Sequence, residues 1–281
     1  MIVAFLAFQY ADPWRRRLGM AERIGGALCD HAGLVARRGF SIEPATLLGL
    51  CGIGTLFNDH LSGGQAAFGL AATETRAGHL IDLAGGAAAY FARLREVNKA
   101  FLADTERRMR RLEKEFGAAS FTVQDRPDWS AVQPLLEAKR GQYARTGVSD
   151  ALGNPAALAL LRALLEADTA DCRPVLTTLS AGGRMLAGHL GLLHAGCLSY
   201  WFPVYDPAAQ KVSPGRLLLW RTIEAADRLG IRLIDRGEGD SQAKRDFSTE
   251  VQSFGRVAWQ ARGWRGMLAR TAQAVAWRLG G

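Results

Sequence analysis

The chain has 281 residues, 48% of them apolar, and its 35 basic side chains outweigh 27 acidic ones to give a formal net charge of +8. This size and composition are typical of one large or two smaller globular domains with sizeable cores. The sequence shows no repeat of fixed period and no low-complexity tract. The four cysteines lie far apart and form no CxxC pair, which excludes a zinc knuckle or a disulfide framework and fits a reducing cytoplasm. The positive charge favours acidic partners without choosing among phosphates, nucleic acid and an anionic membrane face.

The N-terminal stretch "MIVAFLAFQY" predicts a buried strand over residues 2–10, because it lacks a basic leader and is too short to span a membrane. Its abrupt start suggests a domain that has lost its first strands, or a start codon that is assigned late. Further strands are predicted at 25–36 and 66–83, with a less regular element around 53–61.

A long amphipathic helix is predicted from residue 86 to residue 116, with Gly117 as its stop. Its apolar residues recur at helical spacing: Phe91, Leu94, Val97, Phe101, Met109, Leu112 and Phe116. The run "RRMRRLEK" within it could bind phosphate, but it is more typical of the solvated face of a long helix.

The second half of the chain changes from helices to a run of strands. A strand at 119–124 precedes helices at 128–145 and 154–167, the second of which begins with Asn154 as N-cap and Pro155. Strands at 174–180, 184–193 and 196–205 follow, then a helix at 214–229, a strand at 231–237 and a helix at 240–249. This order predicts a mixed α/β (α+β) fold rather than a doubly wound sheet.

The start of the 214–229 helix has the features of an anion site. Ser213 is expected to cap the helix, Pro214 fits its first position, and Gly215 allows close approach of a ligand to the backbone. Lys211 and Arg216 add charges that suit a pyrophosphate. An ordinary well-capped helix is the alternative.

Three short motifs occur in order along this region: Tyr205-Asp206-Pro207, Ser213-Pro214-Gly215 and Asp235-x-Gly237-x-Gly239-Asp240-x-x-x-Lys244. Together they resemble the C-terminal acyltransferase domain of the GNAT superfamily, in the branch associated with cellulose and exopolysaccharide biosynthesis, which is related to the tandem-domain peptidoglycan aminoacyl transferases. Upstream, "CDHAGLVA", "FNDHL" and the 86–116 helix are similar to the N-terminal half of that branch.

The resemblance implies a GNAT-like mixed sheet flanked by helices, in a tandem of two GNAT-like halves of which the first is incomplete. The expected divisions are residues 1–118 for the N-terminal half, 119–262 for the acyltransferase domain and 263–281 for a basic amphipathic tail.

The resemblance also implies acetyl-CoA, or another acyl-CoA, in a cleft between the strand ending at Tyr205 and the strand ending at Asp235, with no metal. The cofactor-binding residues implied are Tyr200, Trp201, Phe202 and Val204 for the pantetheine arm, and Lys211, Ser213, Gly215 and Arg216 for the pyrophosphate. The sequence departs from the family pattern in two places. The phosphate loop is reduced to "KVSPGR", which bears on the affinity for the cofactor, and Ala243 replaces the usual aromatic residue before the lysine, which bears on the packing of the active site.

Acyl transfer needs a base for the nucleophile and a donor for the oxyanion or the leaving thiolate. Asp235 or Glu238 is predicted to be the base, and Lys244 the donor. The alternative for Lys244 is a surface lysine paired with Asp240.

The acceptor is expected to be a small molecule or a glycan, such as a sugar, a polysaccharide or a cell-envelope precursor. Acceptor-site candidates are Asp30, His31, Asp59, His60, Tyr205 and Asp240. His189 and His194 are more typical of hydrogen-bonded strand or turn histidines. No histidine set has metal-ligand spacing.

Two other function classes remain open: a transferase that takes aminoacyl groups from transfer RNA, and a non-catalytic scaffold of a polysaccharide synthesis complex. No specific nucleic-acid partner is otherwise expected. The tail carries Arg262, Arg265, Arg270 and Arg278 without an acid. This pattern allows a cytoplasmic protein to bind peripherally to the inner face of the membrane. The alternative is a helix docked on its own domain.

Overall fold

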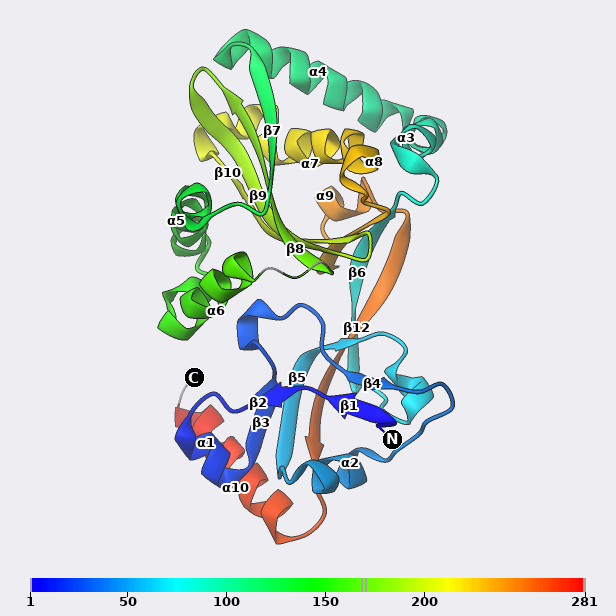
Figure 1. The fold of residues 1–281 in the computed structure, drawn as a ribbon, viewed down its shortest axis with the longest axis vertical. Helices are drawn as coiled ribbons and strands as arrows, with labels where there is room; N and C mark the ends of the chain where they lie inside the picture. The colour runs from blue at the N-terminus through cyan, green and yellow to red at the C-terminus, as the bar shows by residue number, and fades with distance from the viewer. Residues whose placement is uncertain (1, 168, 170, 280–281) are drawn as a thin grey trace. The chain divides into compact units, whose positions relative to one another are not determined.

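The computed structural model describes residues 2–167, 169 and 171–279, and its contacts divide the chain into two compact units. The terminal unit comprises Met1–Gly78 and Gln252–Gly281, and the central unit comprises His79–Val251. In Figure 1 the terminal unit therefore combines blue and cyan segments with orange and red ones from the other end of the chain. The division expected at residue 118 falls inside the central unit.

The terminal unit contains short strands and helices: β1 (Ala4–Leu6), β2 (Phe8–Gln9), α1 (Pro13–Leu18), β3 (Met20–Arg23), β4 (Leu34–Ala36), α2 (Pro44–Cys51), β5 (Thr55–Ser62) and α10 (Trp264–Leu279). The strands β2, β3, β5 and β12 (Glu250–Gln260) are neighbours in that order, and β1 pairs separately with β4. Leu48, Ile53 and Val257 lie in its core with less than 2% of their surface exposed. Across the described residues, no helix is both long and apolar enough to span a bilayer.

Two strands predicted for this unit are shorter than expected, because glycines interrupt them. Gly25 and Gly26 take positive φ angles of 74° and 53°, which break the predicted 25–36 strand and leave only β4 at its end. Gly69, at φ 82°, closes a 3₁₀ turn over Gln65–Phe68, so the predicted 66–83 strand begins only at Glu74.

The central unit contains the longer elements: α3 (Gly86–Val97), α4 (Lys99–Phe116), β7 (Ala119–Asp125), α5 (Trp129–Thr146), α6 (Pro155–Glu166), β8 (Cys172–Ala181), β9 (Arg184–His194), β10 (Cys197–Tyr205), α7 (Pro214–Glu224), α8 (Ala226–Leu229), β11 (Leu233–Glu238) and α9 (Gln242–Arg245). Its strands follow the order β6 (Glu74–Asp82), β11, β10, β9, β8, β7. The strands β7 to β10 form an antiparallel meander, whereas β10 and β11 are parallel. The predicted mixed α/β fold is confirmed.

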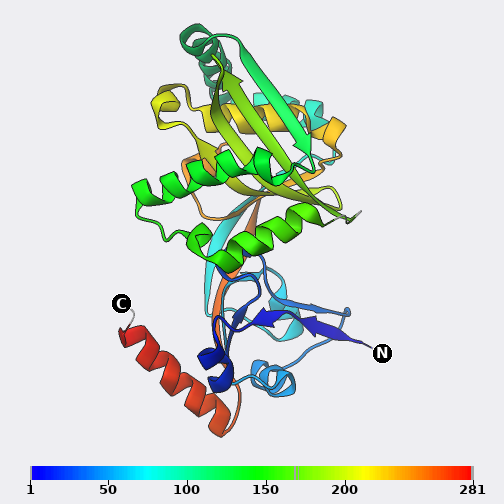
Figure 2. The same cartoon turned by 60° about the vertical axis from the view of Figure 1, so that its left-hand side comes forward.

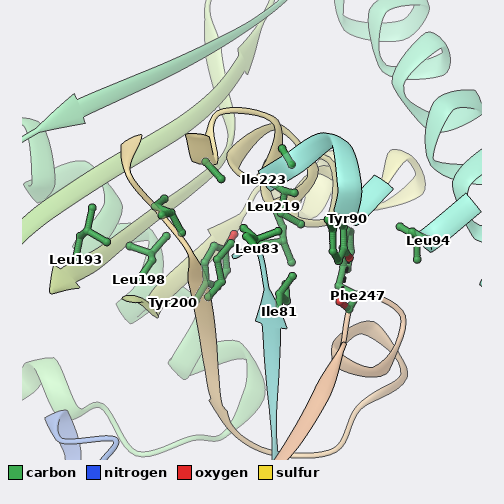
Figure 3. Packing of buried hydrophobic residues seen from close by; sticks show 14 of the residues in the cluster. Ile81, Leu83, Tyr90, Leu94, Leu193, Leu198, Tyr200, Leu219, Ile223 and Phe247 are labelled. Carbon is green, nitrogen blue, oxygen red and sulfur yellow. Dashed lines mark hydrogen bonds between the residues drawn. The ribbon is translucent and has the colours of Figure 1, made fainter. Parts of the chain in front are cut away.

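Helices cover both faces of this sheet. Figure 2 shows α5 and α6 in front of the meander and α7 behind it. Between α7 and the sheet lies an apolar core in which Tyr90, Leu219 and Phe247 converge (Figure 3). The Tyr90 hydroxyl donates to the Phe247 carbonyl at 2.9 Å, which ties α3 to the segment after α9.

The predicted elements of this half differ from the structure in several places. The 86–116 helix is two helices, because Asn98 leaves the helical conformation and its side chain accepts from the Phe101 amide at 3.2 Å as the cap of α4. The predicted helix at 240–249 is only the single turn α9, and β12, which begins at Glu250, is a strand that the sequence did not predict.

Candidate functional site

The parallel strands β10 and β11 separate after a short paired segment. Their register runs from Cys197 opposite Leu233 to Ser199 opposite Asp235, and a bulge in β10 lies between Ser199 and Phe202. Beyond Ser199, β10 continues to pair with β9 as far as Tyr205. The two strands therefore form the sides of a wedge, at the place where the sequence predicted a cleft.

A cavity of about 420 Å³ lies in this wedge and is lined entirely by the central unit. Its lining comprises Phe101, Tyr200, Pro203, Tyr205, Gln210, Ser213, Pro214, Gly215, Arg216, Leu219, Arg236, Ala243, Asp246 and Phe247. Five predicted site residues are among them: Tyr200, Tyr205, Ser213, Gly215 and Arg216. Trp201, Phe202, Val204 and Lys211 lie on the same elements but outside this lining.

The start of α7 differs from the predicted anion site. Ser213 occupies the N-cap position of α7 as predicted, but it takes a positive φ of 54° and its side chain makes no capping hydrogen bond. Its Oγ instead accepts from Arg108 Nη1 at 2.9 Å. The Ser213 amide donates to the Gln210 carbonyl at 2.9 Å, and the Arg216 amide to the Ser213 carbonyl at 3.0 Å. Two of the three amides expected to receive a pyrophosphate are thus already engaged, because the 3₁₀ turn Pro207–Val212 folds back on the helix start.

The Arg216 guanidinium is engaged as well. Its Nη1 lies 2.8 Å from Asp104, its Nη2 donates to the Phe101 carbonyl at 2.7 Å, and its plane covers the Phe101 ring at 3.8 Å. Asp104 also accepts from Arg108 at 2.7 Å, and this hydrogen bond is the main reason why the pKa of Asp104 falls to about 2. Arg216 therefore joins α7 to α4, while Lys211 remains exposed beside them.

Arg236 and Tyr200 are the first residues beyond the paired segment on each strand. The Arg236 guanidinium lies 6.0 Å from the Tyr200 ring and 5.9 Å from the Phe247 ring, and its Nη1 donates to the Ala243 carbonyl at 2.7 Å. Among the described residues, neither the buried Arg236 Nε nor the buried Tyr200 hydroxyl has a hydrogen-bond partner. A buried polar group without a partner costs about 1–3 kcal/mol, so these atoms mark a place where ligand atoms would be favourable.

The His189 ring packs against the Tyr200 ring. The two rings stack with centroids 3.7 Å apart and planes within 7°. Burial lowers the pKa of His189 to about 3, so its imidazole is neutral at physiological pH. This agrees with the expectation of a strand histidine. Burial likewise raises the pKa of Tyr200, which keeps its phenol protonated.

The predicted catalytic residues lie beside the cavity rather than in its lining. Successive side chains of a strand point to opposite faces, so Asp235 faces away from the side that Arg236 occupies. The Asp235 carboxylate accepts from the Gly237 amide at 2.8 Å. The Lys244 ammonium donates to the carbonyls of Arg236 at 2.6 Å, Gly237 at 3.2 Å and Glu238 at 2.5 Å. This contact fastens α9 to the end of β11.

Asp240 pairs with residues other than Lys244. Its carboxylate lies 2.9 Å from His79 Nε2 and 2.8 Å from Arg245, and the hydrogen bond from Arg245 is the main cause that lowers the pKa of Asp240. The alternative Asp240–Lys244 pair does not form among the described residues. His79 is 3% exposed and was not singled out in the sequence, although "GHL" lies on a predicted strand.

The predicted acceptor-site histidines meet in the terminal unit. Asp59 lies 2.5 Å from Arg23 Nη1 and 3.1 Å from His60 Nδ1, and the His60 hydrogen bond is the main reason why the pKa of Asp59 falls to about 2. The rings of His31 and His60 both contact Phe254, at centroid distances of 4.8 and 5.9 Å. Asp30 lies beside His31 in the loop before β4.

No group of three histidine, cysteine or acidic residues in the described part of the chain could hold a metal ion. The structure thus contains an apolar cavity with cationic and phenolic groups in the central unit, and a separate Arg–Asp–His cluster in the terminal unit. The first has the dimensions and lining of a ligand site.

Comparison with known proteins identifies the wedge-containing region. Residues 99–245, slightly more than half of the chain, match the family model described as an acetyltransferase (GNAT) domain. No curated protein matches the chain significantly.

Solved structures share the fold at low sequence identity. The C-terminal domain of a putative lysylphosphatidylglycerol synthetase from Agrobacterium fabrum is 11% identical with a TM-score of 0.57, over 98% of this chain and 85% of that one. FemX is 9% identical with a TM-score of 0.54, over 87% of this chain and 84% of that one. A conserved protein of unknown function from Bacteroides thetaiotaomicron is 11% identical with a TM-score of 0.51, over 76% and 73%.

Proposed function

We propose that this chain, which belongs to the GNAT acetyltransferase family, transfers an acyl group from an acyl-CoA, in the first instance acetyl-CoA, to an amine or hydroxyl group. The acceptor we propose is a sugar, a polysaccharide or another cell-envelope precursor, as the succession of motifs from Tyr205 to Lys244 suggests by resemblance.

The observation that carries this proposal is the cavity between the separated strands β10 and β11. The edge of β10 beyond Ser199 faces a space instead of β11, so its backbone can pair with the amide groups of a pantetheine arm. Phe101, Leu219 and Phe247 supply apolar walls for the methylene groups.

The phosphate groups would lie at the corner between α4 and the start of α7. The exposed Lys211 and the Gly215 amide offer positive charge there, and Arg107, whose side chain is 73% exposed on α4, adds to it although it pairs with Asp104. This differs from the pyrophosphate site expected from the sequence, because Arg216 and two of the amides are engaged within the chain.

In the transfer step the C–S bond of the thioester breaks and a new C–N or C–O bond forms, while the nucleophile loses a proton and the thiolate gains one. Asp246 is the carboxylate that lines the cavity among the described residues, and it accepts from Gln242 Nε2 at 2.6 Å. We therefore propose Asp246 as the base, in place of Asp235 and Glu238. Lys244 would act by positioning the end of β11.

The test follows thiol release from acetyl-CoA with a panel of amino sugars and polysaccharide fragments. Asp246→Asn should lower kcat by about a hundredfold while the affinity for CoA changes little. The matched control is Asp227→Asn, which alters a carboxylate that accepts from the Ala87 amide outside the cavity lining. Parental turnover in Asp246→Asn would exclude it as the base.

The same acceptor panel, tested with aminoacyl-tRNA as the donor in place of acetyl-CoA, distinguishes the other open function classes. The net charge of +8 is compatible with an aminoacyl-tRNA donor, whose binding would fall steeply with salt. Transfer from aminoacyl-tRNA without any thiol release would replace the acyl-CoA proposal, and no transfer from either donor would favour a scaffold.

A further inference from the structure

We propose that the deep end of the cavity recognises a carboxylate, held by Arg236 and Tyr200, on a short aliphatic chain of the donor or the acceptor. This inference rests on the proposed function. It adds that the donor or the acceptor of the acyl transfer carries a carboxylate.

The two residues lie at the point where the paired segment of β10 and β11 ends. Tyr200 follows Ser199 and Arg236 follows Asp235, and Ser199 and Asp235 are the last pair that the two strands form. Both side chains line the cavity. They therefore lie where the wedge is narrowest, at the end that a bound chain would reach with its terminus.

Both residues bring unused hydrogen-bonding capacity to this end. Tyr200 is 8% exposed, and its hydroxyl has no partner among the described residues. Arg236 donates to the Ala243 carbonyl, but its Nε has no partner, and it forms no ion pair with any described carboxylate. A guanidinium in apolar surroundings is strongly stabilised when a carboxylate binds it.

Arg216, the other arginine of the lining, provides an internal comparison. It also contacts an aromatic ring, but Asp104 lies 2.8 Å from its Nη1. The chain thus places a carboxylate directly against the arginine at the helix start, whereas Arg236 has no ion-pair partner among the described residues and receives only the longer-range attraction of the Asp246 charge. A ligand carboxylate would form an ion pair with Arg236, as Asp104 does with Arg216.

The remaining lining limits the shape of this ligand. Phe247 and Leu219 are apolar and suit methylene groups, while Asp246 would repel a carboxylate placed near it. The ligand carboxylate is therefore directed toward the Tyr200 side of Arg236. A dicarboxylic acyl group such as succinyl has the required chain and charge, whereas acetyl would leave Arg236 without a partner.

The carboxylate could belong to the acyl chain of the donor or to the acceptor, and calorimetry on the full chain separates these sources. One arm compares succinyl-CoA with butyryl-CoA, which matches its chain length without the charge. The other arm titrates free succinate into protein saturated with CoA.

The key variant is Arg236→Met, which removes the charge but retains an unbranched side chain. Its matched control is Arg228→Met on α8, where the arginine is exposed. Tyr200→Phe tests the second donor with minimal change in packing. Melting temperatures of all variants report whether they fold.

If the donor carries the carboxylate, we expect the parent and Arg228→Met to bind succinyl-CoA at least tenfold more tightly than butyryl-CoA. If the acceptor carries it, we expect both proteins, saturated with CoA, to bind succinate at least tenfold more tightly than the uncharged butyramide. Arg236→Met should abolish this preference, so that it binds the charged ligand no more tightly than the uncharged one, and Tyr200→Phe should weaken the preference severalfold. A preference for succinyl-CoA assigns the carboxylate to the donor, and a preference for succinate to the acceptor.

Equal affinity for charged and uncharged ligands in the parent, or a preference that persists in Arg236→Met, would overturn the inference and leave the acyl-CoA proposal standing. If CoA does not bind at all, the proposed function fails. In that case succinate alone still tests the inference: an Arg236-dependent rise in melting temperature supports it, and no rise overturns it.

Discussion

At the scale of single residues, the motif from Asp235 to Lys244 marks the correct region but not the correct side chains. Strand alternation places Arg236, and not Asp235, on the side of the cavity. That alternation could have been read from the sequence, because the strand over 231–237 was predicted. Which face carries the cavity could not be read, since this depends on α7 and on the segment after α9.

Lys244 is expected to stabilise the fold rather than the transition state. Its ammonium binds three carbonyl groups at the end of β11, so Lys244→Met should lower the free energy of unfolding by about 1–3 kcal/mol. Urea denaturation measures this change, with the exposed Lys114→Met on α4 as the control. A variant of parental stability that has lost turnover would instead restore the catalytic role predicted from the sequence.

The Asp59 cluster should give the terminal unit a pH-dependent stability. The pKa of Asp59 is about 2 in the folded chain against 3.8 as the ordinary value, so its contribution is complete above about pH 4 and is lost as the pH falls toward 2. The contribution should be about 1–2 kcal/mol, because the side chain is 29% exposed.

Unfolding free energies of the parent and Asp59→Asn between pH 7 and pH 2 measure this effect. The two curves should be separated at neutral pH and should converge in acid. The exposed Glu250→Gln serves as the control. A separation that is constant over the whole range would show that Asp59 does not titrate with a lowered pKa in the folded chain.

At the scale of elements, local sequence signals predicted the helices α5 and α6 and the meander β8 to β10 well. Each has hydrophobic periodicity, a cap or a glycine turn within its own residues. The strand β12 was missed, because its partner β5 lies almost 200 residues earlier in the chain. Its residues Glu250–Gln260 give no local indication of that pairing.

The tail helix α10 retains an exposed apolar edge in the structure. Trp264 is 67% exposed and Met267 63% exposed, beside the exposed Arg270, whereas Ala269 is buried. The side chains of Arg265 and Arg278 lie outside the described residues. One side of the helix packs on the chain, as expected for a helix docked on its own domain. Another side carries exposed apolar and basic groups, as expected for a helix that contacts a membrane.

If this edge binds membranes, vesicles with anionic lipid should carry the full chain upward in a flotation gradient, and neutral vesicles should not. Trp264→Ser together with Met267→Ser should abolish flotation without a change in melting temperature. Leu50→Ser, which alters an exposed apolar residue of α2, is the control. Equal flotation of the parent and the double variant would remove the tail edge from membrane binding.

At the scale of the whole molecule, the family could be inferred from the order and spacing of three motifs, each of which is weak alone. The division of the chain could not be inferred, because the terminal unit combines residues from both ends. Residues 79–118, expected in the first half, pack in the core of the central unit through Leu94, Phe101 and Leu112.

We propose that the cavity between β10 and β11 holds an acyl-CoA, with its phosphates at the start of α7. Gly215 is suited to testing it, because an added Cβ would meet only the Tyr205 ring, at 4.0 Å. Gly49 of α2 is the matched control, since an added Cβ there meets nothing within 4 Å.

The most direct measurement is calorimetric titration of CoA into the parent, Gly215→Asp and Gly49→Asp. We expect CoA to bind the parent and Gly49→Asp, and to bind Gly215→Asp at least tenfold more weakly, because the aspartate repels the phosphates. Equal CoA affinity in all three proteins would contradict the assignment of the phosphates to this helix start, and absence of binding in all three would contradict the acyl-CoA account itself.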